Sequence, residues 1–274
     1  MRAIFGLTPY TFSMSHFEQI VDSSAVRIHD EQADRFRDHY AILANNHYAN
    51  TFVYKRKSIL DFCDLNLADL AGPILDIGCG TGHLLQRYQD QGITTVGCDP
   101  SNEMLGHASR GQQLAALARA CGEQVPFAND SFDAVLCIEV MRWLTPTHVE
   151  AVLREAMRVL RPGGIAIISF APPFNNRVHA LFCRVAAIHN ADRSARTVQY
   201  FHSIRVIEQM LKKTGFDGID ISPRFVAPFS TLELALPRSI PVLLRYWESM
   251  DNRLSKLSFT HRLCNIFLAK ARKP

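Results

Sequence analysis

Glycine stands at every second position of a short segment, as Gly78, Gly80 and Gly82, directly after an apolar run. Glycine lets the chain turn tightly and bring bare backbone against a ligand, and a helix that starts there offers free N–H groups. The spacing is not the GxGxxG of nicotinamide-binding proteins, because His83 and Leu85 occupy the positions of the third glycine. The spacing therefore argues against a dinucleotide.

Two acidic residues flank this glycine segment. Asp76 precedes it, and Asp99 ends the next apolar run, seventeen residues after Gly82. A carboxylate at the position of Asp99 can accept hydrogen bonds from both hydroxyls of a ribose, which indicates an adenosyl ligand. Asp76 would repel a pyrophosphate but attract an ammonium or a sulfonium group. The charge pattern therefore predicts S-adenosylmethionine as the ligand.

Short apolar runs separated by helical patterns must position these residues. The runs cover 74–77, 94–98, 133–138 and 165–170. Continuously apolar strands spaced by helices indicate a parallel sheet that is covered on both faces. Further strands are expected at 218–222 and 264–271, and helices within 30–70, at 145–160, from 203 to 215 and at 239–257.

The chain resembles the class I S-adenosylmethionine-dependent methyltransferases of quinone, sterol and natural-product pathways, from about Gly72 to Ser222. The resemblance rests on ILDIGCGTGHL, VGCDPSNEML, GEQVPFANDSFDAVLCIEVMRWL and VLRPGGIAIISF. It implies a Rossmann-like, doubly wound α/β fold with a mostly parallel seven-stranded sheet, N-terminal helices and helical insertions after strands 5 and 6. It also implies methyl transfer to a small or carrier-linked metabolite.

The resemblance further implies how the cofactor is held. The glycines would line its amino-acid part, Asp99 the ribose, and Met104 and the edge at Gly122 and Glu123 the adenine. Cys121 stands where relatives often have an aspartate, so backbone contacts are expected to serve the adenine amino group. The complete expected set is Asp76, Gly78, Cys79, Gly80, Gly82, Asp99, Pro100, Met104, Gly122, Glu123, Cys137 and Arg56. Arg56 either meets the cofactor carboxylate or serves helix packing only.

Metal and nucleic-acid chemistry are not expected. Some relatives read EVLEH after the fourth strand, and these acids and the histidine can hold a divalent metal. Here the stretch 139–143 reads EVMRW, which replaces the second acid by a cation and the histidine by an indole. No NPPY-like tetrapeptide of nucleic-acid methylases ends that strand.

A catalytic base is needed only if the acceptor loses a proton. The candidates are Glu139 and His202, with His179 and His189 in the first insertion. Each histidine could equally be an ordinary surface or capping residue, and Glu139 could be structural. Two other functions stay open: an adenosyl-binding module that has lost catalysis and works through protein partners, and a nicotinamide oxidoreductase.

The expected organisation is a flexible leader at 1–29 and a single domain at 30–274. Within it, 30–70 is a helical lid, 72–222 the cofactor-binding core, and 171–202 with 224–262 are substrate-side insertions. The scattered cysteines and the lack of a long apolar segment predict a cytoplasmic protein with reduced thiols.

Positive charge gathers toward the C-terminus. From Pro223 to Pro274 there are nine Lys or Arg residues against three acidic residues. Within this region, 239–257 has an apolar stripe at helical spacing together with Arg245, Arg253 and Lys256. Such a helix either rests on a membrane surface or packs on its own domain and roofs an apolar substrate pocket.

Overall fold

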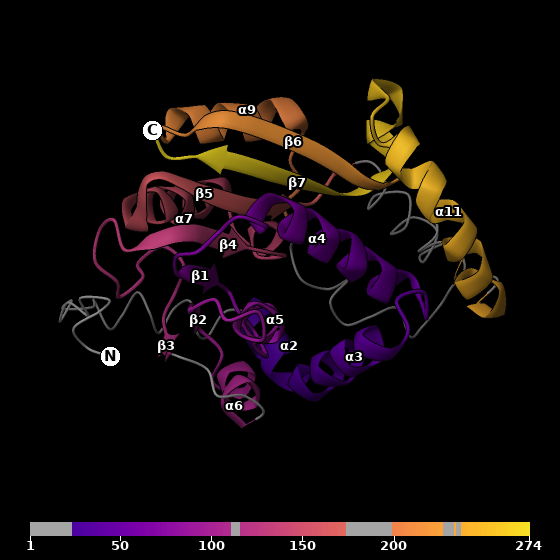
Figure 1. The fold of residues 1–274 in the computed structure, drawn as a ribbon, viewed down its shortest axis with the longest axis horizontal. Helices are drawn as coiled ribbons and strands as arrows, with labels where there is room; N and C mark the ends of the chain where they lie inside the picture. The colour runs from indigo at the N-terminus through magenta and orange to yellow at the C-terminus, as the bar shows by residue number, and fades with distance from the viewer. Residues whose placement is uncertain (1–23, 111–115, 174–198, 227–232, 234–236) are drawn as a thin grey trace.

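A seven-stranded sheet forms the centre of the protein (Figure 1). The computed structural model describes residues 24–110, 116–173, 199–226, 233 and 237–274. The strand order is β3-β2-β1-β4-β5-β7-β6; the first five are parallel, and β7 runs antiparallel to both of its neighbours. The strands are β1 (Ile74–Ile77), β2 (Thr95–Asp99), β3 (Ala116–Arg119), β4 (Phe132–Cys137), β5 (Leu160–Phe170), β6 (Asp217–Val226) and β7 (Cys264–Arg272). The predicted mostly parallel sheet of seven strands is confirmed.

Helices cover both faces of the sheet. On one face α4 (Thr51–Leu67) and α5 (His83–Gln89) pack on Ile74, and on the other α7 (Pro146–Val159) and α9 (Ile204–Lys213) pack in the same core cluster as Leu75 and Ile77. This alternation follows from the two-residue period of a strand. At least three of the described helices begin at side-chain caps. Asn50 accepts from the Val53 N–H at α4, Thr145 from the His148 N–H at α7, and Ser203 from the Val206 N–H at α9.

The remaining helices surround this core. The short helices α2 (Ser24–Glu31), α3 (Ala33–Asn45) and α6 (Asn102–Arg110) pack on one another, and α11 (Ile240–Leu254) lies at the far end, against α4 and β6. The 3₁₀ helices are η1 (Met141–Trp143), η3 (Pro237–Ser239) and η4 (Ser258–Leu263). None of the helices in the described ranges is long and apolar enough to cross a membrane.

The structure differs from the sequence prediction at the N-terminal boundary. Residues 24–29, which were expected to belong to a flexible leader, form most of α2. The reason is tertiary packing: Val26 is buried, and α2 packs against α3 and α6, so a helix of only eight residues gains the contacts that it could not supply alone. Residues 1–23 and most of the first expected insertion, 174–198, lie outside the described residues.

Candidate active site

A cavity of about 490 Å³ opens at the carboxyl ends of β1, β2 and β4. The strand order reverses between β1 and β4, and such a switch point is where open α/β sheets bind ligands. Ten of the twelve residues predicted to hold the cofactor line this cavity: Arg56, Asp76, Gly78, Cys79, Gly80, Asp99, Pro100, Met104, Gly122 and Glu123.

The glycine loop has the left-handed backbone that glycine tolerates. The φ angles are 75° at Gly78, 53° at Gly80 and 79° at Gly82. An added Cβ at Gly78 would lie 2.3 Å from Val140 Cγ2, whereas at Gly80 the nearest atom would be Met104 Sδ at 3.9 Å. Gly78 is therefore required by packing, and Gly80 keeps the cavity itself clear.

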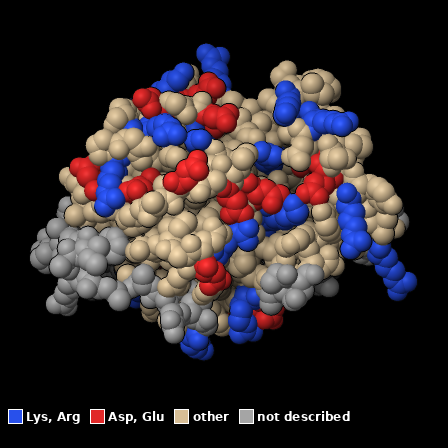
Figure 2. Space-filling model, viewed as in Figure 1, with Lys and Arg blue, Asp and Glu red and all other residues tan. Residues whose placement is uncertain are grey.

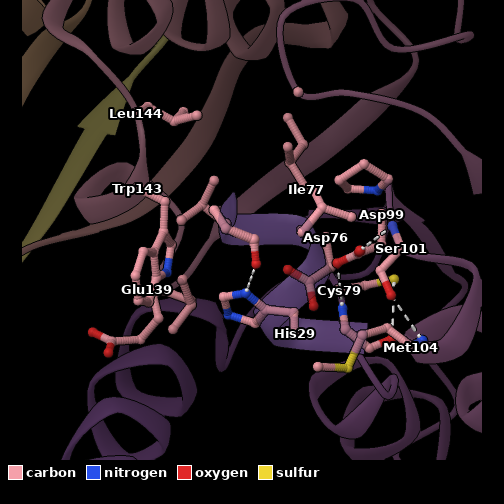
Figure 3. Close-up of a pocket in the computed structure, with 18 of the residues that line it drawn as sticks. His29, Asp76, Ile77, Cys79, Asp99, Ser101, Met104, Glu139, Trp143 and Leu144 are labelled. Carbon is pink, nitrogen blue, oxygen red and sulfur yellow. Dashed lines mark hydrogen bonds between the residues drawn. The ribbon is translucent and has the colours of Figure 1, made fainter. Parts of the chain in front are cut away.

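Asp99 is held by the loop that it faces. Its Oδ2 accepts from the Gly80 N–H and its Oδ1 from the Ser101 N–H, both at 2.9 Å (Figure 3). Burial raises the pKa of Asp99, and the two N–H donors oppose that shift. Each carboxylate oxygen keeps a second lone pair, so Asp99 can still accept hydrogen bonds from a ligand.

Asp76 and Arg56 bring opposite charges to the same cavity. Asp76 is 2% exposed, and its Oδ1 has no hydrogen-bond partner among the described residues; the same holds for Arg56 Nε. The Arg56 guanidinium lies over the rings of Tyr40 and Phe52. Burial, together with the nearby negative charge of Asp99, raises the pKa of Asp76 to about 8, while Arg56 opposes this shift. Asp76 Oδ1 and Arg56 Nε are therefore available to a ligand.

Comparison with known proteins identifies this part of the chain. Residues 75–168 match the family described as "Methyltransferase domain". Residues 75–168 carry a methyltransferase domain. This methyltransferase domain spans β1 to β5 and so includes β1, β2 and β4, at whose carboxyl ends the cavity opens.

The relatives of the methyltransferase domain include proteins of known and unknown function. An uncharacterised methyltransferase of Mycobacterium tuberculosis is 39% identical over 37% of this chain and 40% of its own length. A ubiquinone biosynthesis O-methyltransferase of Rhizobium rhizogenes is 31% identical over 58% of this chain and 64% of its own length. The chain thus spans about half the length of the curated relatives that it matches.

Solved structures share the fold at low identity. The magnesium protoporphyrin IX methyltransferase of Synechocystis, solved with bound S-adenosylhomocysteine, matches with a TM-score of 0.59 at 16% identity, covering 92% of this chain and 100% of that one. A possible histamine N-methyltransferase of Thermotoga maritima matches with a TM-score of 0.55 at 16% identity, covering 90% and 99%. These two likenesses extend the shared fold beyond residues 75–168.

Glu123 is a buried acceptor on another wall of the methyltransferase cavity. Its Oε1 makes no hydrogen bond with the described residues, although His148 Nδ1 lies 3.6 Å away. Cys121 and Gly122 line the same wall. An added Cβ at Gly122 would meet Ile77 Cγ2 at 2.8 Å, so this position needs glycine because β1 packs against it. Glu123 and Gly122 were expected at the adenine edge, with backbone contacts to the adenine amino group; the Glu123 side chain offers a carboxylate oxygen on this wall as well.

Glu139, a predicted base candidate, is bound in an ion-pair cluster. Its Oε2 lies 2.7 Å from Lys55 Nζ and 3.0 Å from Arg142 Nη1. Its φ is 63°, and its N–H donates to Ser169 Oγ at 2.6 Å. Burial raises the pKa of Glu139, but Lys55, Arg142 and Arg56 outweigh burial and hold it well below its ordinary value. A carboxylate so stabilised is a poor proton acceptor, which favours the structural interpretation.

Three other predicted residues that the structure describes lie away from the cavity walls. His202 is 4% exposed, packs edge-on against Phe170 and does not line the cavity; burial lowers its pKa. Gly82 caps α5, and Cys137 is fully buried in β4. The candidates His179 and His189 lie outside the described residues.

His29 also lines the cavity, although it was not among the residues predicted from the sequence. Its Nδ1 lies 2.7 Å from the carbonyl oxygen of Ala25 and must donate to it, because a carbonyl only accepts. Its ring is stacked on Phe36 and meets Trp143 edge-on, with centroids 5.6 Å and 5.1 Å apart. Figure 3 shows it among Glu139, Trp143 and Asp76. Placing 1–29 in a flexible leader removed His29 from consideration, although the seven-residue spacing to Phe36 was a helical signal.

Proposed function

We propose that this protein binds S-adenosylmethionine and transfers its methyl group to a small or carrier-linked metabolite with an apolar, aromatic surface. The observation that carries the proposal is a pair of buried polar atoms without hydrogen-bond partners, Asp76 Oδ1 and Arg56 Nε, on residues that line one cavity. A buried polar atom without a partner is costly, so an acid and a base in this state indicate a ligand that offers a cationic group to one and an anionic group to the other. The amino-acid end of S-adenosylmethionine is a zwitterion of this kind.

The other orphan groups fit the rest of the ligand. Asp76 would hold the ammonium group and Arg56 the carboxylate. Asp99 has lone pairs left for the ribose hydroxyls, and the buried Glu123 Oε1 can accept from the adenine amino group. Glu123 would thereby accept from the adenine amino group in place of the aspartate that relatives often have at the position of Cys121.

When bound, S-adenosylmethionine supplies a methyl carbon attached to a positively charged sulfur, which is already a good leaving group. The protein therefore needs mainly to position the acceptor and to exclude water. The aromatic side chains of Phe36, Trp143 and Tyr200 line the cavity and would exclude water from it. They also favour a flat or apolar acceptor over a strongly charged one.

His29 is the proton acceptor that we propose for an acceptor hydroxyl. Because Nδ1 donates to Ala25, the neutral ring carries its lone pair on Nε2. His29 thereby takes the role that the sequence analysis gave to Glu139 or His202. A hydroxyl acceptor is supported by the name of the Rhizobium relative, a ubiquinone biosynthesis O-methyltransferase.

Calorimetry and a methyl-transfer assay test the proposal. S-adenosylhomocysteine should bind and NADH should not, and Asp99→Ala should weaken binding by about 1 to 3 kcal/mol, the range for charged hydrogen bonds. The exposed Asp69 is a matched control, and its Ala variant should bind normally. Methyl transfer from labelled donor to an extract of candidate phenolic acceptors then separates an enzyme from an adenosyl-binding module that lacks catalysis. Absence of binding to S-adenosylhomocysteine would refute the proposal.

A further inference from the structure

One side of the C-terminal region exposes an unusual concentration of apolar side chains. Of the ten large hydrophobic residues that are exposed in the described ranges, seven lie between residues 242 and 263. Tyr246 and Phe259 are the most open, at 78% and 75% exposure. We name this surface the α11 face; its apolar members are Val242, Leu243, Tyr246, Met250, Leu257, Phe259 and Leu263.

The opposite side of α11 is firmly packed. Ile240 and Leu244 are fully buried in a cluster with Tyr54 and Phe225. Asp251, 3% exposed, accepts from the Phe225 N–H at 3.1 Å. The helix is thus already docked on its own domain, and the exposed apolar stripe is not the side that this docking uses.

The charges of the region are also sorted by side. Arg238, Arg245, Arg253 and Lys256 are exposed, although the Arg245 guanidinium also lies over the ring of Tyr48, 5.7 Å from its centroid. The described acids between 233 and 263 are engaged toward the body of the protein: Asp251 as above, Glu248 with Lys57 and Tyr48, and Glu233 with Thr51. Figure 2, viewed as Figure 1, shows Lys and Arg side chains projecting at the α11 side of the molecule. The outward charge of the α11 face is therefore positive.

We propose that the α11 face rests on an anionic lipid bilayer. A helix that lies in the membrane interface typically exposes aromatic and aliphatic side chains next to charges that are all positive. The apolar side chains would enter the boundary between headgroups and acyl chains, and the four cations would contact lipid phosphates. A second copy of the chain is a poorer occupant, because a symmetric dimer would place these cations against one another.

This inference does not depend on the proposed function. No residue of the α11 face lines the cavity, so membrane binding and S-adenosylhomocysteine binding can fail separately. The two are related in space through α4, which carries Arg56 in the cavity wall and Lys57 bound to Glu248 of α11.

Vesicle co-sedimentation of the full chain tests the inference. The probes are vesicles of phosphatidylcholine alone and of phosphatidylcholine with phosphatidylglycerol in equal parts. Binding is expected with the anionic vesicles only and should weaken as salt is added. Each Lys or Arg near an anionic surface contributes about fivefold in affinity, so R245E/R253E should bind at least about tenfold more weakly. Y246S/F259S should lose most of the binding to anionic vesicles, because it removes the two aromatic side chains whose burial in the bilayer would stabilise the bound state.

Matched controls separate the face from general surface effects. Leu65, 74% exposed on α4, gives L65S, and Arg154, 60% exposed on α7, gives R154E. Both should bind vesicles like the wild type. All variants should keep the wild-type thermal midpoint and S-adenosylhomocysteine affinity, and the charge-reversal variant remains a test if Y246S/F259S folds poorly.

Three outcomes would overturn the inference. The first is equal binding to neutral and anionic vesicles, or none to either. The second is wild-type vesicle binding by both R245E/R253E and Y246S/F259S. The third is a lipid-free dimer that Y246S/F259S abolishes, which would assign the α11 face to a second copy of the chain.

Discussion

Lys55 Nζ lies 2.7 Å from Glu139 Oε2, joining two residues that are 84 positions apart. The pair connects α4 to the turn after β4, where Glu139 has a left-handed backbone. Both side chains are largely buried, at 15% and 17% exposure. Burial lowers the pKa of Lys55 to about 8, and Glu139 opposes that shift. The pair therefore holds a wall of the cavity rather than supplying a base.

Replacing Lys55 by Met should lower the free energy of unfolding by about 2 kcal/mol, because the largely buried carboxylate of Glu139 loses one of its two cationic partners and keeps only Arg142. Urea unfolding measures this. Lys213→Met is the control: its amine meets Glu150 at 2.8 Å but is 66% exposed, so the loss should be under about 1 kcal/mol. Adding Glu139→Gln to the Lys55 variant should restore part of the stability. Equal losses of unfolding free energy in the two single variants would show that the buried Lys55–Glu139 pair contributes no more stability than the exposed Lys213–Glu150 pair.

Gly80→Ala should reduce S-adenosylhomocysteine affinity by at least about tenfold, because the new methyl group would enter the cavity and strain a residue with φ of 53°. Gly163→Ala is a matched control with φ of 79° and nothing within 4 Å of the added Cβ, and it does not line the cavity. Both variants should lose about 1 to 2 kcal/mol of stability. Calorimetry should find the binding defect in Gly80→Ala alone; a normal affinity there would contradict the assigned loop.

Cofactor binding should release a proton from Asp76 at neutral pH. Its pKa of about 8 keeps the free carboxyl mostly protonated at pH 7, whereas an ammonium group beside it favours the ionised form. Affinity should therefore rise as the pH increases toward about 8 and level off above it. Calorimetry at pH 7 in phosphate and in Tris, whose ionisation enthalpies differ, measures the release. Asp76→Asn should bind weakly and with the same enthalpy in both buffers; a buffer-independent enthalpy in the wild type would refute this role.

His29→Gln should lower kcat by about 100-fold or more, the usual contribution of a positioned base, and leave S-adenosylhomocysteine affinity unchanged. His107, which lies on α6 and does not line the cavity, supplies the control His107→Gln with wild-type kcat. Steady-state kinetics and calorimetry separate the two effects. A parallel loss of cofactor affinity would instead show that His29 closes over the cofactor.

The meeting of the glycine loop and Asp99 at one cavity was predictable because its determinants are local. The glycine loop follows one apolar run, and Asp99 ends the next. If the two runs are parallel neighbouring strands, their carboxyl ends lie side by side and bring the loop and the acid together. The structure has this arrangement, since Asp99 Oδ2 accepts from the Gly80 N–H. The helices within 30–70 and at 145–160, 203–215 and 239–257 were predictable for the same reason, since apolar spacing and caps are written in neighbouring residues.

The sequence by itself determined the glycine loop, its acids and the strands that carry them, because backbone geometry links such residues over short separations. Only the tertiary structure decided that Lys55 neutralises Glu139, that His29 belongs to the cavity and that one side of α11 stays exposed. These facts depend on contacts between distant segments, such as Tyr54 with Asp251, 197 positions apart. The spacing of apolar residues along the sequence does not determine which distant side chain a buried or charged residue will contact in the folded protein.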